Sequence, residues 1–177
     1  MAQDSSLICY DWILHSGNVH YARDRSIFST YVSISAEAQT SVGSRFTIAG
    51  MGTISIEVLR EPDSTETMTL NLRNVLHLPN SKCNGFSLSR CAQAFPNLVI
   101  SFANDAHRTL VDKASDKGIC YGIPFAGLSK LALAGNLVGD SPFAGDDSPK
   151  MMSVYMEQAE LEKCIRAHME EVKQVDV

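Results

Sequence analysis

The chain has 177 residues, a hydrophobic fraction of 45%, a charged fraction of 20% and a formal net charge of -5. This length supports one domain with a hydrophobic core plus a peripheral element, and the composition argues against general disorder. The lysines and arginines are scattered and form no basic stripe of the kind that follows phosphates. We therefore expect no nucleic-acid partner.

The cysteines and the N-terminal residues bear on the compartment. Five cysteines are widely spaced along the chain, and their number is odd. This pattern favours reduced thiols in an intracellular protein over a disulfide framework. The first residues lack the pattern of a secretory signal, and no run approaches the roughly 18 apolar residues of a membrane span. We expect a cytoplasmic protein with no membrane partner.

Short segments rich in β-branched and aromatic residues recur between clusters of Gly, Pro, Asn, Asp and Ser. They lie at residues 7–14, 28–34, 45–48, 53–59, 68–72, 98–102, 109–112 and 119–123. Such spacing is typical of a small β-sandwich or β-barrel. The clearest hairpin joins 52–59 to 67–72, and its first strand alternates polar and apolar residues, which predicts one wet and one buried face.

Two helices are predicted. Ser87 is placed to cap a short helix over 87–95, which Pro96 stops. Near the C-terminus, Ser148 and Pro149 supply an N-cap and a first helical residue for a long helix. Its apolar stripe consists of Val154, Leu161, Ile165, Met169 and Val172. We expect this stripe to pack on the barrel or across a dimer, or else to form a detachable helix that binds a partner.

These elements predict three parts. Residues 1–134 form the β-barrel domain, residues 135–148 form a Gly- and Pro-containing linker, and residues 149–177 form the C-terminal helix.

Residues 12–17 read Trp-Ile-Leu-His-Ser-Gly, and 19–28 carries a His followed by Asp-Arg-Ser-Ile-Phe. These are the first of four ordered motifs that resemble copia-type retrotransposon aspartic proteases, which are retropepsin relatives and have Trp-Ile-Leu-Asp-Ser-Gly at the first motif. Ile-Ala-Gly-Met-Gly-Thr-Ile at 48–54 resembles a Val-x-Gly-x-Gly-Thr-Val strand. Leu-Arg-Asn-Val-Leu-His-Leu-Pro at 72–79, with Cys-Asn at 83–84, resembles the segment before a short helix in that family. The resemblance covers about residues 10–95 and extends more weakly to about 133.

The resemblance implies an all-β fold, a small retropepsin-like (acid-protease) β-barrel with one short helix, to which this chain adds a C-terminal α-helix. In that family each subunit of a homodimer supplies one Asp from an Asp-Ser/Thr-Gly turn. The two carboxylates, about 3 Å apart, share a proton and activate water for attack on a peptide carbonyl. Here His15 stands at the position of that Asp. Two imidazoles cannot share a proton and also carry the required negative charge, so we expect no aspartic-peptidase activity.

The candidate site residues lie in this turn and in a later loop. His15 is a tolerated replacement in a decayed site, a general acid or base at a dimer axis, or a metal ligand. His20 is a second catalytic candidate, with packing as its alternative role. The ligand-binding candidates are the turn residues Ser16, Gly17 and Asn18, together with Gly43, Ser44 and Arg45 where a retropepsin has its hairpin flap. The histidines and cysteines lack zinc-ligand spacing, so we predict no metal site and no cofactor.

Three hypotheses about function follow. The first is a homodimeric pseudoprotease, inactive as an aspartic peptidase, that binds a peptide or a small molecule. The second is a repurposed non-proteolytic enzyme that uses His15 for acid–base chemistry of the isomerase, cyclase or lyase type. The third is a relict protein without a cleft. An open groove lined by unpaired strand edges would favour peptide binding, and a closed apolar cavity facing His15 would favour the enzyme.

Overall fold

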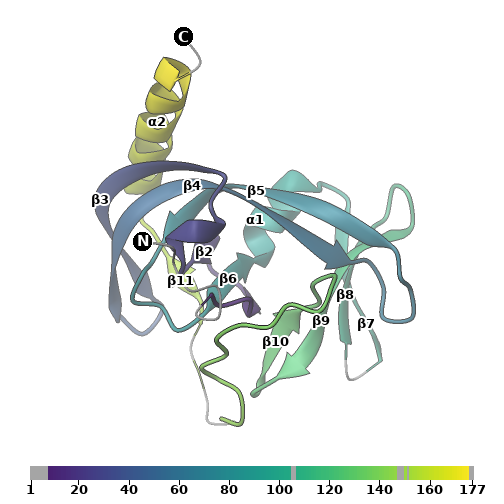
Figure 1. The fold of residues 1–177 in the computed structure, drawn as a ribbon. Coiled ribbons are helices and arrows are strands. Elements are labelled where there is room, and N and C mark those ends of the chain that lie inside the picture. The colour runs from purple at the N-terminus through teal and green to yellow at the C-terminus, as the bar shows by residue number, and fades with distance from the viewer. Residues whose placement is uncertain (1–7, 105–106, 147–149, 151, 176–177) are drawn as a thin grey trace.

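The computed structural model describes residues 8–104, 107–146, 150 and 152–175. Within these residues, strands form one 11-stranded sheet with the order β11-β3-β4-β5-β2-β6-β1-β10-β9-β8-β7. In Figure 1, β3, β4 and β5 arch over the molecule, and α2 and β7 lie at opposite ends of it. The predicted all-β class, the short helix and the C-terminal helix are confirmed. The sheet is open rather than closed into a barrel, because its end strands β11 and β7 do not pair with each other.

The centre of the sheet is built from short strands. They are β1 (Trp12–His15), β2 (Tyr21–Ala22), β6 (Asn84–Ser87) and β10 (Leu128–Leu131). β1 pairs in parallel with β6, which sets His15 opposite Ser87, and pairs antiparallel with β10 on its other side. All four residues of β1 are buried. Two flanking strands therefore fix the direction in which β1 delivers the turn that follows it.

Three long strands form the arch: β3 (Thr30–Thr40), β4 (Arg45–Leu59) and β5 (Thr67–His77). Sequence patterning predicted two strands, 45–48 and 53–59, where β4 runs without a break. Gly50 and Gly52 lie in the part of β4 that joins these two predicted segments, and they make room for neighbouring groups. A Cβ on Gly50 would lie 2.1 Å from the Tyr31 ring, and one on Gly52 would lie 2.0 Å from the Thr30 carbonyl.

The second half of the sheet is an antiparallel meander of β7 (Leu98–Asn104), β8 (His107–Asp112), β9 (Lys117–Phe125) and β10. Apolar residues of this meander join those of β4, β5 and α1 in the largest core cluster, which includes Trp12, Phe86, Leu110 and Ile119. A second cluster lies beneath β3 and β4 and includes Met51, Leu76, Val154 and Leu161. A short 3-10 helix, Arg25–Ile27, leads into β3.

The short helix α1 (Leu88–Ala94) has the predicted cap, because Ser87 Oγ accepts a hydrogen bond from Arg90 N–H over 3.1 Å. The long helix α2 (Gln158–Val175) begins later than the predicted start at 149, and residues 154–155 instead form the two-residue strand β11. Glu157 starts the helix, since its carboxylate accepts from Glu160 N–H over 3.2 Å. The predicted cap at 148–149 lies outside the described residues.

The buried face of α2 also differs from the predicted stripe. Leu161, Cys164 and His168 are buried, whereas Met169 is 52% exposed. Leu161 and Ile165 of the predicted stripe do pack in the second core cluster. Val154 belongs to β11 rather than to the helix, so the stripe was correct only in part. No helix among the described residues is long and apolar enough to cross a membrane.

The segment predicted as a linker contacts the N-terminal part of the domain in its described portion, 135–146. Asp140 N–H donates to the Ile8 carbonyl over 2.9 Å, and its carboxylate pairs with Arg23 at 2.7 Å. Phe143 is 3% exposed and packs with Cys9 and Ile13. The division of the chain into three parts stays a prediction.

Candidate functional site

The turn after β1 holds the His15 ring through its own backbone. Gly17 N–H donates to His15 Nδ1 over 3.0 Å, so the neutral ring carries its proton on Nε2. That Nε2 is buried and has no hydrogen-bond partner in the described structure. Burial lowers the pKa of His15 from 6.5 to about 4, and the backbone of Gly85 acts in the opposite direction. At pH 7 the ring is neutral and shielded from solvent.

His20 has different surroundings. Ser87 N–H donates to its Nδ1 over 3.0 Å, so this neutral ring also carries its proton on Nε2. Burial lowers the pKa of His20 to about 3, and the charges of His15 and Arg90 act in the same direction. The ring packs 5.1 Å from that of Phe86 and lines a groove of about 570 Å³ between β5 and α1. The His15 ring instead packs against Tyr21, so the two histidines do not share one cavity.

Residues 152–156, here called the strap, cover the turn. The Asn18 side chain pairs with the backbone of Met156 in both directions: Nδ2 donates to the carbonyl over 2.8 Å, and Oδ1 accepts from the N–H over 2.9 Å. Ser16 Oγ lies 3.1 Å from Ser153 Oγ and 3.4 Å from the Tyr155 hydroxyl. The side chains of the turn thus bind an extended segment of the same chain.

The strap also joins the turn to the β3–β4 hairpin. Val154 pairs with Thr40 at the end of β3. On the other side, a Cβ on Gly17 would lie 2.0 Å from the Val154 carbonyl oxygen. Tyr21 hydroxyl donates to the Met152 carbonyl over 2.9 Å. Glycine at position 17 is therefore required by the close approach of the strap.

The tip of the β3–β4 hairpin holds the other predicted ligand residues. Gly43 has a φ of 86°, a conformation that favours glycine, and a Cβ there would meet nothing within 4 Å. Ser44 carbonyl accepts from Thr40 N–H over 2.8 Å. Arg45 pairs with Glu37 at 3.2 Å on the surface and lines a shallow hollow of about 220 Å³ with Tyr155. Arg45 thus lies near the strap, whereas Gly43 and Ser44 shape the turn of the hairpin.

The N-terminus of α1 supports the turn from the opposite side. Ser87 Oγ and Ser89 Oγ both donate to the Gly17 carbonyl, Ser89 over 2.6 Å. Sequence reasoning gave Ser87 a capping role only. Its position opposite His15 across β1 and β6 explains the second role, because this parallel pairing brings the start of α1 beside the turn.

Two acidic side chains near the turn in sequence have partners elsewhere. Asp11 pairs with Lys130 at 3.0 Å and accepts from Ser141. Asp24 accepts from Cys9 N–H over 2.9 Å and pairs with Arg23. Neither carboxylate stands in for an acid at position 15. The described residues also contain no group of three or more His, Cys, Asp or Glu side chains that could hold a metal ion.

The fold and the turn define a β-sheet domain that presents a histidine-containing turn at the end of a buried strand. Comparison with protein families is consistent with this: the model described as Pol polyprotein, beta-barrel domain matches residues 12–94. The match supports a retrotransposon Pol-derived origin for this part of the chain. Comparisons with curated proteins and with solved structures gave no match.

The strap is the part of the site that sequence reasoning missed. Its residues were assigned to the beginning of the C-terminal helix, because Val154 fitted the apolar stripe. The adjacent Val154 and Tyr155 are strand-favouring residues and were the available signal. Two residues are too short a run to distinguish a strand from a helix by periodicity.

Proposed function

We propose that this chain is a retrotransposon-derived, non-proteolytic module that binds an extended peptide between the turn at 15–18 and the β3–β4 hairpin. The observation that carries this proposal is the strap. It is an extended segment that pairs with β3 on one side and with Asn18 on the other, so the surfaces it touches can bind a peptide backbone. The predicted residues Ser16, Gly17 and Asn18 are the turn side of this binding site.

The absence of proteolysis follows from the chemistry at position 15. We infer that His15 replaces the acid of the related proteases, and no carboxylate of Asp11 or Asp24 is free to act in its place. The His15 ring is 5% exposed and packs against Tyr21, so it is shielded from a peptide that binds where the strap lies. The same burial makes acid–base catalysis by His15 the weaker proposal, because a general acid or base must come within hydrogen-bond reach of its substrate.

The strap and an external ligand compete for one site. A tethered segment acts at an effective concentration that reaches the millimolar range for short linkers. An external peptide with similar contacts therefore binds weakly until the strap leaves. The predicted homodimer is subject to the same competition: pairing of two turns through residues 16–18 requires contacts that the strap occupies. We propose that strap docking and dimerisation through the turn exclude each other.

The test uses the full chain with the strap released. Val154 is 1% exposed, so Val154→Asp places a charge in the core contact of the strap and leaves the turn intact. A labelled peptide with the sequence of residues 150–157 should bind this variant roughly ten-fold or more tightly than it binds the unmodified chain. Fluorescence polarisation measures the binding, and mass spectrometry of the same mixture should recover the peptide uncut. Sedimentation should detect a dimer with the variant but not with the unmodified chain.

Two further variants make the result decisive. Met156→Pro removes the N–H that Asn18 accepts and releases the strap by a second route if Val154→Asp does not fold. Asn18→Ala added to either variant should abolish peptide binding. Equal binding to the unmodified and released chains, or binding that survives Asn18→Ala, would contradict a shared site. Cleavage of the peptide would contradict the absence of proteolysis.

A further inference from the structure

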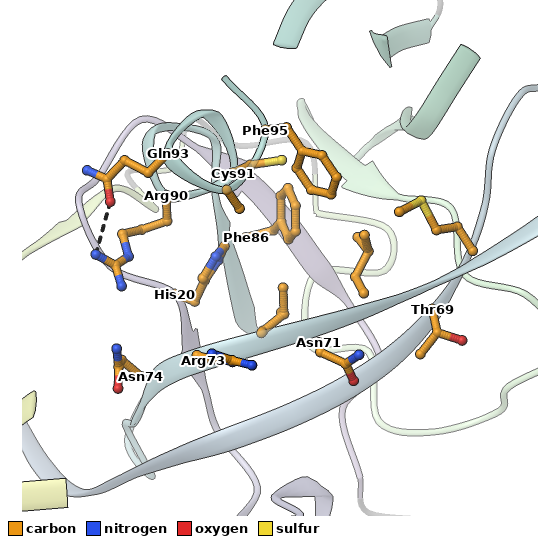
Figure 2. A pocket seen from close by; sticks show the side chains of 14 residues that line it. His20, Thr69, Asn71, Arg73, Asn74, Phe86, Arg90, Cys91, Gln93 and Phe95 are labelled. Atoms are coloured by element: carbon orange, nitrogen blue, oxygen red, sulfur yellow. Dashed lines mark hydrogen bonds between the residues drawn. The ribbon is translucent and has the colours of Figure 1, made fainter. Parts of the chain in front are cut away.

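A groove separate from the strap runs between β5 and α1. It is lined by residues 68–74 of β5, by 90, 91 and 93–95 of the α1 region, and by His20 and Phe86, and its volume is about 570 Å³. Figure 2 shows Phe86 and His20 between the helix and the β5 ribbon. None of these residues contacts the strap in the hydrogen bonds described above. The groove is therefore a second site, independent of the proposed function.

One wall of the groove is an unpaired strand edge. β4 pairs with β5 along its length, from Thr67 to His77, whereas β2 pairs with β5 only at Leu76 and His77. Among the described strands, none pairs with the other edge of β5 along 68–74. Such an edge presents backbone N–H and C=O groups that another strand can pair with. At about 3.3 Å per residue, this edge is roughly 20 Å long and accommodates five or six residues of an extended peptide.

The floor of the groove is apolar and one of its ends is basic. Leu70, Leu72, Phe86 and Cys91 are buried there. Figure 2 shows Arg73, Asn74, His20 and Arg90 toward one end of the groove and Thr69 toward the other. The lining contains two arginines and no acidic residue, although the chain as a whole carries a net charge of -5. This contrast favours a ligand with an anionic group at the basic end.

The basic end contains positive charges and hydrogen-bond donors that no carboxylate of the described residues pairs with. Arg90 donates to the Gln93 side chain over 3.0 Å, and neither Arg73 nor Arg90 has a carboxylate partner among the described residues. His20 also lines this end of the groove, and its Nε2–H is the donor that remains after Nδ1 accepts from Ser87. A carboxylate oxygen of a ligand could accept from this donor and pair with the two guanidinium groups.

We propose that this groove binds an extended peptide as an added strand on β5, with a carboxylate of the peptide bound by Arg73, Arg90 and His20 Nε2. The strand edge favours a peptide over a small carboxylate, because only a repeating backbone satisfies successive N–H and C=O groups. Apolar side chains of the peptide would pack on Leu70, Leu72 and Phe86. The carboxylate comes from an acidic side chain or from the end of the peptide chain.

The experiment is a selection from a library of N-acetylated random hexapeptides on the immobilised full chain. The library is presented once with amidated C-termini and once with free C-termini, which separates the two sources of carboxylate. We expect the enriched peptides to combine a carboxylate with alternating apolar residues and to shift the NMR amide signals of residues 69–74. Arg73→Glu and Arg90→Glu should each weaken binding roughly ten-fold or more. Arg166→Glu, the same charge change on the exposed face of α2, should leave it unchanged.

Several results would overturn this inference. One is a selection that enriches no peptide. Another is binding to Arg73→Glu and Arg90→Glu that is as tight as binding to the unmodified chain. A third is NMR signal shifts confined to residues 16–18 and the strap. An enriched peptide with its central backbone nitrogens methylated should bind less well, and undiminished binding would exclude strand addition. Hexanoate that shifts the same amides as strongly as the peptides would identify a small-carboxylate site instead. Binding that Asn18→Ala abolishes belongs to the strap site, so the two proposals fail separately.

Discussion

At the scale of single residues, His15 and His20 are each held neutral by the fold. Each ring accepts a backbone N–H at Nδ1, from Gly17 and from Ser87, and each is 5% exposed. Protonation would place a charge in a buried environment and would make Nδ1 a donor facing another donor. The two buried histidines therefore make the folded chain more stable at neutral pH than in acid. Neither ring has a pKa suited to proton transfer at pH 7.

The first prediction concerns the stability of the folded chain at acidic pH. Between pH 6.5 and about 4, the unfolded chain protonates His15 while the folded chain does not, so stability falls as the pH decreases through this range. Between pH 7.5 and 4.5, His15 should account for a loss of about 2 to 3 kcal/mol in the free energy of unfolding. Urea denaturation of the unmodified chain and of His15→Asn at both pH values measures this. The asparagine oxygen can accept from Gly17 N–H without titrating, so the loss should be smaller in the variant.

The control for this prediction is His107→Asn, at a partly exposed histidine of β8. It should keep the full loss of stability in acid. If His15→Asn shows the same pH dependence as the unmodified chain, burial of the His15 ring is not its source. His20, with a pKa of about 3, should extend the loss to still lower pH.

At the scale of elements, α1 connects three parts of the site. Ser87 caps the helix, donates to the Gly17 carbonyl and, through its backbone, donates to His20. It is 0% exposed, so water cannot replace these contacts. β6, α1 and the turn at 15–18 therefore form one unit whose geometry depends on a single buried hydroxyl.

The next prediction tests this hydroxyl. Ser87→Ala should lower the free energy of unfolding by about 2 kcal/mol, because it removes a helix cap and leaves the Gly17 carbonyl with one donor fewer. Ser89→Ala is the matched control: it removes the second donor to Gly17, with its contacts to Ser87 Oγ and the Ser16 carbonyl, but leaves the helix cap, and should cost about 1 kcal/mol or less because Ser89 is exposed. Equal effects of the two variants in thermal or urea denaturation would contradict the role assigned to Ser87.

At the scale of the whole molecule, the cysteines are distributed through the apolar interior. All five are free and buried, with Cys91 and Cys120 in the largest core cluster, Cys164 beneath β3, and Cys9 and Cys83 near Phe143. Burial raises the pKa of Cys9 to about 11 and that of Cys91 to about 12, and it shifts the other three thiols in the same direction. Because the thiolate is the reactive form, these groups should be inert in the folded chain.

The last prediction follows from this inertness. A thiol reagent such as dithionitrobenzoate should modify the native chain only slowly at pH 8, and it should modify all five thiols once guanidinium unfolds the chain. Val42→Cys, at a hairpin position that is 69% exposed, is the positive control and should react at once. A native cysteine that reacts as fast as this control would show that its part of the core opens readily.

The sequence predicted the local elements wherever side-chain pattern alone decides the structure. The alternation in 53–59 and 67–72 predicted the β4–β5 hairpin, and Ser87 with Pro96 marked the ends of α1. Gly43 was placed at the tip of a hairpin, and it lies there with a positive φ. The sequence did not show why residues 50 and 52 are glycine: Tyr31 and Thr30 approach these positions of β4 too closely for a side chain. That requirement comes from the neighbouring strand and leaves no local signal.

By itself, the sequence determined the all-β class, the short helix and the turn that presents His15, since these follow from periodicity, caps and turn residues. Only the tertiary structure decided that residues 152–156 form a strap over that turn, that Gly17 is required by the closeness of Val154, and that His15 and His20 face different surroundings. The tertiary structure also determined that the sheet stays open and that, among the described strands, one edge of β5 is left unpaired along residues 68–74. The physical reason is that these features depend on contacts between segments up to 139 residues apart, which the pattern of either segment alone does not encode.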